Sequence, residues 1–256
     1  MKRYNFANIL FSGPCNLRCP YCIGKQIDPA LQVNNLTRFP LRNLDAFITL
    51  LKQHRVTEIS FTGTNTDPQL YRHEARLLNR LREQLPPVTQ NGKEKTVQYS
   101  LHTNGQLALK KMDVFNCYNR VSISFPSFKP KIYRQLTGVP RPPNLAEIMR
   151  QAKIPVKISA VLTPANANDA EEFLDRCGEI GVKRVAFRQL FGDTRDWPVF
   201  HRLQQTGSYC NNPVYNYHGI QITWWRFDRS ASASLNLFSN GLISNRYLLT
   251  SEQVSR

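Results

Sequence analysis

The stretch GPCNLRCPYC, residues 13–22, directly follows an apolar run at residues 5–12. Short apolar runs bounded by glycine, proline or asparagine predict β-strands, so the stretch is expected to form the loop after a first strand. Its three thiols, Cys15, Cys19 and Cys22, are spaced so that a short loop can turn them toward one point. Thiolate sulfurs are the ligands that soft metals and iron–sulfur clusters prefer. The sequence therefore predicts a metal-binding loop at the carboxyl end of this strand.

Strand and helix patterns alternate beyond this loop. Strands are predicted at residues 5–12, 58–62, 97–102, 120–125, 156–162 and 184–190, and helices at 41–54, 68–85, 107–115, 131–136, 145–152 and 169–180. Alternating strands and helices build βαβ units with a parallel sheet. Six units over about 190 residues predict an α/β fold, a partial (β/α)6 TIM-type barrel, with chemistry at the carboxyl ends of its strands.

The alternation stops after Phe191, which divides the chain into a core at residues 1–191 and a C-terminal extension at residues 192–256. Apolar runs at 235–238 and 242–244 flank Ser239-Asn240-Gly241. Asn-Gly between two such runs is typical of a β-hairpin turn. We expect this hairpin to close the open barrel.

Composition describes a globular chain with a strong positive charge. The 256 residues include 34 Lys+Arg and 18 Asp+Glu, a net charge of +16, and 41% are hydrophobic. This apolar content argues against a disordered protein, and the absence of a long apolar run or signal-peptide pattern predicts a cytoplasmic protein without membrane segments. The charge makes nucleic acids, nucleotides and acidic proteins candidate partners.

Arginines recur every four residues on the predicted helix 68–85, at Arg72, Arg76 and Arg80. Residues at this spacing share one face of a helix. A solvated outer face and a track for nucleic acid both remain open at this point.

Two metal chemistries suit the cysteine loop. A structural zinc ion normally takes a fourth ligand, and His54 is the nearest following histidine. A cluster held by three thiolates instead leaves one iron free, and that iron can be chelated by the amino and carboxylate groups of S-adenosylmethionine (SAM). The even number of cysteines, six, also permits disulfides, but the clustering of three favours metal binding.

The CxxxCxxC spacing with Tyr21 before the third cysteine resembles the radical SAM superfamily. The resemblance implies one [4Fe–4S] cluster on Cys15, Cys19 and Cys22, which reductively cleaves SAM to a 5′-deoxyadenosyl radical. It also implies an external one-electron reductant of the flavodoxin or ferredoxin type. Tyr21 would then lie near the adenine of SAM.

The resemblance extends over residues 5–250 with weaker motifs. The second strand ends in FTGTNTDP, residues 61–68, where the family carries a turn that holds the amino group of SAM. The implied contacts are Gly63, Thr66 and Asp67. Asp67 is equally a helix N-cap, since Pro68 follows it. The third strand ends in HTNG, residues 102–105, similar to a turn of the family, which makes Asn104 a further candidate.

Three later residues are also candidates for the cofactor. Ser124 and Ser159 lie near the ends of the fourth and fifth strands, where family members contact the ribose and carboxylate of SAM. Arg188, near the end of the sixth strand, is predicted to bind a carboxylate or phosphate if it points inward, or to form a salt bridge if it points outward.

Residues 121–138 and 156–193 look like the GTP cyclase branch of the superfamily. That branch carries a second cluster on three further cysteines, whose positions fall here on Arg229, Ser232 and Arg246. The second cluster is therefore not expected, and the GTP reaction loses support. The weaker substrate candidates are Lys129, Arg134, Trp225, Arg226 and Asn236, which together predict an anionic substrate.

The function predicted from the sequence is hydrogen abstraction from an anionic, nucleotide-like small molecule by a radical SAM enzyme. Two enzyme alternatives remain open: modification of a nucleic acid, and activation of a glycyl-radical partner protein. A protein that holds an iron–sulfur cluster for binding or redox sensing, without using SAM, is the alternative outside enzymes.

Overall fold

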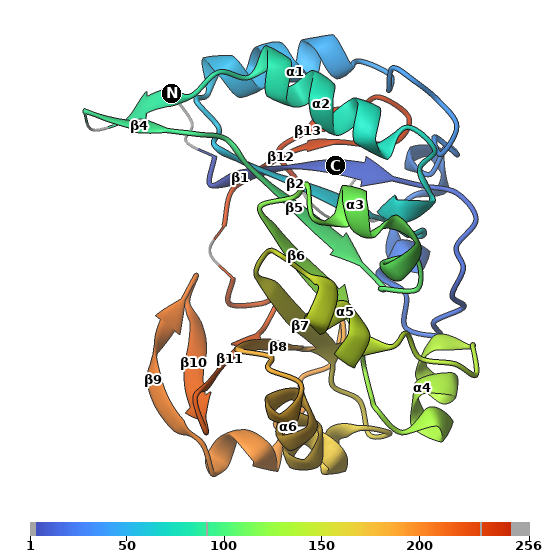
Figure 1. Ribbon diagram of the computed structural model, residues 1–256, viewed down its shortest axis with the longest axis vertical. Helices are drawn as coiled ribbons and strands as arrows, with labels where there is room; N and C mark the ends of the chain where they lie inside the picture. The colour runs from blue at the N-terminus through green and yellow to red at the C-terminus, as the bar shows by residue number, and fades with distance from the viewer. Residues whose placement is uncertain (1–3, 91, 231, 247–256) are drawn as a thin grey trace.

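The computed structural model describes residues 4–90, 92–230 and 232–246, and its centre is an eleven-stranded sheet (Figure 1). The six predicted strands are present and pair in parallel as consecutive neighbours. They are β1 (Phe6–Phe11), β2 (Glu58–Gly63), β5 (Gln98–Thr103), β6 (Arg120–Ser124), β7 (Val156–Val161) and β8 (Arg184–Arg188). The expected partial-barrel core is confirmed.

Helices connect these strands, as βαβ units require. They are α1 (Leu44–Gln53), α2 (Glu74–Gln84), α3 (Met112–Phe115), α4 (Pro130–Thr137), α5 (Leu145–Gln151) and α6 (Ala170–Glu179). The helix expected at 68–85 is split, because Tyr71 takes an extended conformation between a 3-10 turn at Pro68–Leu70 and α2. The backbone N–H of Arg72 donates to the carbonyl of Leu36, which ties this break to the preceding loop.

The two faces of the sheet differ in chemistry. Alternate residues such as Ile9, Phe61, Leu101 and Phe187 are buried in the hydrophobic core. The residues between them form a second, polar face, and the register aligns His102, Ser122 and Lys157 across β5, β6 and β7. We call this second face the inner face. Successive side chains of a strand point to opposite faces, so period-two patterning produces this division.

The C-terminal extension lengthens the sheet at both edges. β9 (Gln204–Tyr209), β10 (Asn212–Tyr217) and β11 (Ile220–Trp225) form a meander whose β11 pairs in parallel with β8. β12 (Ser234–Leu237) and β13 (Ile243–Ser244) form the predicted hairpin, with β12 parallel to β1. A separate hairpin of β3 (Val88–Gln90) and β4 (Lys93–Lys95) lies outside this sheet.

The expected closure of the barrel is not seen among the described residues. The hairpin bonds to β1 on one edge of the sheet, while β9 ends the other edge (Figure 1). The hairpin cannot close the sheet because the edge beyond β8 is taken by the meander. A search of the described residues for a helix long and apolar enough to cross a membrane finds none.

Candidate functional site

The cysteine loop is fastened at the carboxyl end of β1 by three contacts from different elements. The backbone N–H of Arg18 donates to the carbonyl of Thr137 at the end of α4, over 2.7 Å. Thr66 Oγ1 donates to the carbonyl of Pro14, and Asn104 Nδ2 donates to Asn16 Oδ1, both over 2.7 Å. The loop is thus connected to α4 and to the turns that follow β2 and β5.

The three thiols of the loop influence one another. Burial and, to a smaller extent, the neighbouring Cys22 and Cys15 together raise the pKa of the Cys19 thiol to about 12. Burial also raises the pKa of Cys15. Nowhere in the described part of the chain do three or more His, Cys, Asp or Glu side chains form a group that could hold a metal ion. The cysteines therefore share one loop without forming a closed ligand set.

The turn after β2 lies against this loop and depends on two glycines. A Cβ atom on Gly63 would lie 1.7 Å from the carbonyl oxygen of Thr66, and one on Gly24 would lie 2.4 Å from that of Thr64. The same carbonyl of Thr64 lies 3.8 Å from Cys22 Sγ. Only residues without a Cβ fit these approaches, so the two segments pack backbone against backbone.

Asp67 ends this turn and is 3% exposed. Its carboxylate accepts hydrogen bonds from the backbone N–H groups of Gln69 (2.8 Å) and Asn104 (2.6 Å) and from Thr103 Oγ1 (2.9 Å). Asp67 therefore caps the short helix at Pro68–Leu70, one of its two predicted roles. Burial raises the pKa of its carboxyl group, and the hydrogen bonds oppose that rise. A contact from Thr66 or Asp67 to SAM stays a prediction.

A second buried carboxylate lies next to this turn. Glu74 accepts from Lys111 Nζ (2.6 Å) and from the Tyr118 hydroxyl (3.0 Å), while Lys111 also donates to the carbonyl of Gln69. Sequence reasoning missed this group. The available signal was the spacing of Glu74 from Leu77, Leu78 and Leu81, which places a charge on the apolar stripe of a helix.

The inner face holds a group of cationic side chains. Arg188 Nε donates to Ser159 Oγ over 2.8 Å, and its Cζ lies 6.0 Å from the ring centroid of Trp225. The structure thus brings three predicted residues together. Burial and, to a smaller extent, the neighbouring charges of Arg188, Arg184 and Arg120 together lower the pKa of Lys157 to about 7. Burial lowers the pKa of His102 well below its usual value, and Lys157 adds to that effect.

Lys157 and His102 were missed as site residues by the sequence analysis. Lys157 stands between the apolar residues Val156 and Ile158, and His102 follows Leu101, so a period-two pattern on these strands places both on the polar face. Ser124, which was predicted, is exposed at the end of β6 and pairs in register with Ser159.

The other candidates are placed differently. Lys129 forms ion pairs with Asp169 (2.8 Å) and Glu172 (2.7 Å), and Arg226 pairs with Asp228 (2.8 Å). Asn236 has no exposed surface and accepts a hydrogen bond from Asn8 over 2.7 Å. These three side chains are engaged by protein groups, so they do not join the group around Arg188. Arg134 is exposed on α4, and Tyr21 is half-buried.

The zinc alternative fails on the position of His54. This residue ends α1, and its ring centroid lies 4.8 Å from that of Tyr4, which precedes β1. The cysteine loop follows the opposite end of the same strand. The length of β1 therefore separates His54 from the three thiols.

Comparison with known proteins supports one family. A family model described as the radical SAM superfamily matches residues 9–185. Among curated proteins, GTP 3′,8-cyclase from Limosilactobacillus fermentum (strain NBRC 3956 / LMG 18251) is 23% identical over 236 residues, which is 86% of this chain and 66% of that protein. The chain thus spans slightly less than two thirds of that relative.

Solved structures share the fold. Streptococcus suis SuiB bound to the precursor peptide SuiA has a TM-score of 0.54 at 19% identity, covering 73% of this chain and 40% of SuiB. The protein anSMEcpe with bound AdoMet and the Cp18Cys peptide has a TM-score of 0.52 at 18% identity, covering 76% of this chain and 54% of its own. The family match spans the cysteine loop and nearly the whole six-stranded core, and on that basis this chain belongs to the radical SAM superfamily of enzymes, which use SAM and an iron–sulfur cluster.

Proposed function

We propose that this enzyme holds one [4Fe–4S] cluster on Cys15, Cys19 and Cys22, cleaves SAM reductively, and abstracts hydrogen from an anionic small molecule bound on the inner face. The support for the first part is the donor set, three thiols in one loop at the carboxyl end of β1. The support for the second part is the group of basic side chains around Lys157, which includes Arg188 beside Ser159 and Trp225.

The cysteine loop fits a cluster in its chemistry and in its surroundings. Raised thiol pKa values show that the thiolate form lacks compensation, and cationic iron would supply it. When bound, the cluster would pass one electron from an external flavodoxin- or ferredoxin-type reductant to SAM, which yields methionine and the 5′-deoxyadenosyl radical. The loop contacts to α4 and to the turns after β2 and β5 would orient the three sulfurs.

The inner face is suited to an anion because two of its basic side chains, Lys157 and His102, have no acidic partner among the described residues. Neither Lys157 nor His102 takes part in any ion pair of the described residues. A half-buried ammonium among other cations costs free energy that an anionic ligand would offset. Arg188 can present two parallel N–H donors to a phosphate or carboxylate, and the Trp225 ring beside it offers a flat surface to a nucleobase.

The similarity to GTP 3′,8-cyclase fits a nucleotide-like substrate but not that reaction itself. Arg229, Ser232 and Arg246 stand where the cyclase branch carries the cysteines of its second cluster. We therefore propose a single cluster and a different reaction on an anion of similar size.

The test is an anaerobic reconstitution with iron and sulfide, followed by dithionite and SAM. Wild type is expected to form 5′-deoxyadenosine, and the triple Cys15→Ala/Cys19→Ala/Cys22→Ala variant is expected to form none. A triple Cys117→Ala/Cys177→Ala/Cys210→Ala variant, which removes the other thiols, controls for non-specific loss of sulfur. The proposal would be refuted if the EPR signal of the cluster did not change on addition of SAM and no 5′-deoxyadenosine formed. That result would favour a binding or sensing protein.

A further inference from the structure

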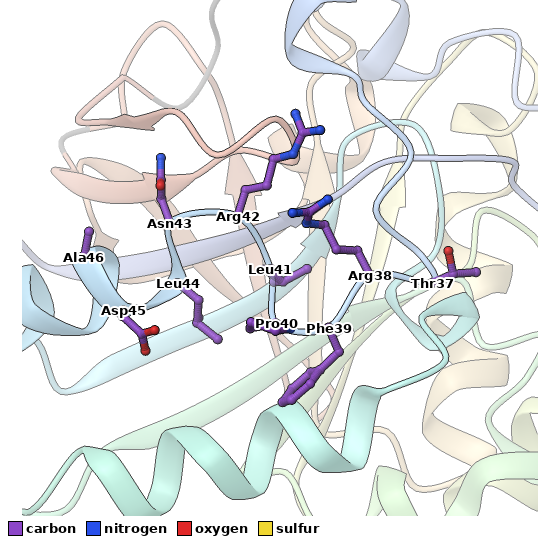
Figure 2. A pocket seen from close by; sticks show the side chains of 10 residues that line it. All are labelled: Thr37, Arg38, Phe39, Pro40, Leu41, Arg42, Asn43, Leu44, Asp45 and Ala46. Atoms are coloured by element: carbon purple, nitrogen blue, oxygen red, sulfur yellow. The ribbon is translucent and has the colours of Figure 1, made fainter.

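A surface pocket of about 630 Å³ lies on the outer side of the molecule and is lined by residues 37–46 (Figure 2). Figure 2 shows the side chains of Arg38 and Arg42 extending to the same side of this loop. Both arginines are exposed, and neither takes part in an ion pair of the described residues. The pocket is also lined by Asp45, but this carboxylate pairs with Arg80, so the guanidinium groups of Arg38 and Arg42 border the pocket without an ion-pair partner of their own among the described residues.

Helix α2 brings further arginines to the same place. The Cζ atom of Arg76 lies 4.1 Å from the ring centroid of Phe39, which lines the pocket, and that of Arg80 lies 5.9 Å from the same ring. Arg80 is paired with Asp45 over 2.6 Å, whereas Arg76 pairs with no described carboxylate. We define Arg38, Arg42 and Arg76 as the arginine surface. It carries three positive charges that internal ion pairs do not neutralise.

The loop that carries Arg38 and Arg42 is held in place without using their guanidinium groups. The Tyr71 hydroxyl donates to the carbonyl of Arg38 over 2.8 Å, and Asn43 Nδ2 donates to the carbonyl of Gly241 over 2.9 Å. A Cβ on Gly241 would lie 2.8 Å from the Cβ of Arg42, so the turn between β12 and β13 packs closely on the loop. The backbone is ordered by these contacts while the charged ends stay available, which lowers the entropic cost of binding.

We propose that the arginine surface binds the phosphodiester backbone of a nucleic acid. A guanidinium group donates two parallel hydrogen bonds to phosphate oxygens, and arginine is the residue that suits this geometry best. The cations come from two elements, the loop and α2, so they can contact successive phosphates rather than one ion. A pocket admits a protruding phosphate and sugar, whereas the broad face of an acidic protein would leave the pocket unfilled. The site is separate from the inner face and does not depend on the proposed reaction.

Fluorescence anisotropy of a labelled, short single-stranded RNA of mixed sequence tests this proposal, with salt varied from about 50 to 200 mM. Each phosphate contact contributes about 0.7 to the slope of log affinity against log salt concentration for a single strand. The Arg38→Gln/Arg42→Gln variant is therefore expected to reduce the slope by about 1.4 and the affinity by about tenfold. Both side chains are exposed, so the fold is expected to survive.

The matched control is Lys93→Gln/Lys95→Gln, which removes the same charge from exposed positions on β4. Equal losses of RNA affinity in the two variants would show that only net charge matters, and they would overturn the proposal. Absence of RNA binding by wild type at the lowest salt would also overturn it. Competition by poly-glutamate as strong as competition by unlabelled RNA would assign the surface to an acidic protein instead. Formation of 5′-deoxyadenosine is measured in parallel, so failure of the reaction and failure of the surface are told apart.

Discussion

Two polar regions inside this protein differ in whether their ionisable side chains have compensating partners. Around Asp67 and Glu74, which are 3% and 2% exposed, the carboxylates are surrounded by donors from the turn after β5, from Lys111 and from Tyr118. On the inner face, Lys157 and His102 have cations for neighbours and no acidic partner among the described residues. The two carboxylates of the first region are paired by groups of the protein itself, whereas Lys157 and His102 in the second are not paired with a carboxylate of the described residues.

The contrast distinguishes polar residues with a structural role from polar residues that are available to a ligand. Burying a polar group costs free energy unless it is hydrogen-bonded, so a complete set of partners indicates a structural role. An incomplete set indicates a ligand when the group faces an accessible surface. By this criterion, Asp67 and Glu74 shape the turns that hold the cysteine loop, and Lys157 is the residue of the inner face that we propose for the anionic substrate.

The largest effect is expected from Glu74→Ala. The substitution leaves the Tyr118 hydroxyl buried without an acceptor and removes the carboxylate opposite Lys111, so it should lower the free energy of unfolding by about 3 kcal/mol. Glu83→Ala, at an exposed position of the same helix, should change it by less than about 0.5 kcal/mol. Urea denaturation measures both variants, and equal values would remove the structural role assigned to Glu74.

The next largest loss of stability is expected from Asp67→Ala, and Asp28→Ala provides a matched comparison. Asp28 and Asp67 both precede a proline and cap a 3-10 helix, but only Asp67 also accepts from Thr103 and Asn104. Loss of a cap alone costs about 1 kcal/mol, so Asp28→Ala should lower the unfolding free energy by that amount. Asp67→Ala should cost about 1 kcal/mol more than Asp28→Ala, for a total of about 2 kcal/mol, because it leaves buried donors unpaired. Similar costs for the two variants would show that the additional bonds contribute no stability.

Lys157→Met should change stability in the opposite direction. The folded pKa of Lys157 is about 7 and its ordinary value is 10.5, so between these pH values the unfolded chain binds a proton that the folded chain does not. Stability due to this residue therefore rises with pH across that window, and the cost of the buried charge is fully present below about pH 7. The methionine variant should be more stable than wild type by roughly 1 kcal/mol near pH 6.

Denaturation at several pH values checks this sign. The advantage of Lys157→Met should shrink toward pH 10, whereas Lys153→Met, at an exposed position, should show no such trend. A wild-type protein that is more stable than Lys157→Met at pH 6 would show that Lys157 has a partner in the protein and would weaken the anion site.

Much of the fold could be predicted because its core repeats one local unit. Each βαβ strand lies between helices and carries its own apolar run, so six strands could be located from pattern alone. The edge formed by the meander could not be predicted in this way. β9 is exposed at all six positions and has no apolar signal, and its place is set by pairing with β10. The same lack of local signal explains why the hairpin was expected to close the barrel.

Site residues divide in the same manner. The cysteine loop could be recognised from the spacing of its three cysteines, and Arg188 could be selected from its position near a strand end. Glu74 and Lys111 could not be paired from sequence, because their contact joins segments that follow different strands. The ion pairs of Lys129 could not be predicted either, because its partners, Asp169 and Glu172, lie about forty residues away, and nothing local identifies them.

Gly63 has a consequence that concerns inheritance rather than chemistry. The space beside its α-carbon is already filled by the carbonyl oxygen of Thr66, so even the smallest side chain would have to displace main chain. The constraint at position 63 is therefore on side-chain volume, and it is the same for any substrate. A lineage that exchanges the arginines and aromatics of the inner face for a new reaction can keep this glycine unchanged. We therefore expect Gly63, which has no functional group, to be retained among related enzymes as strictly as the three thiols.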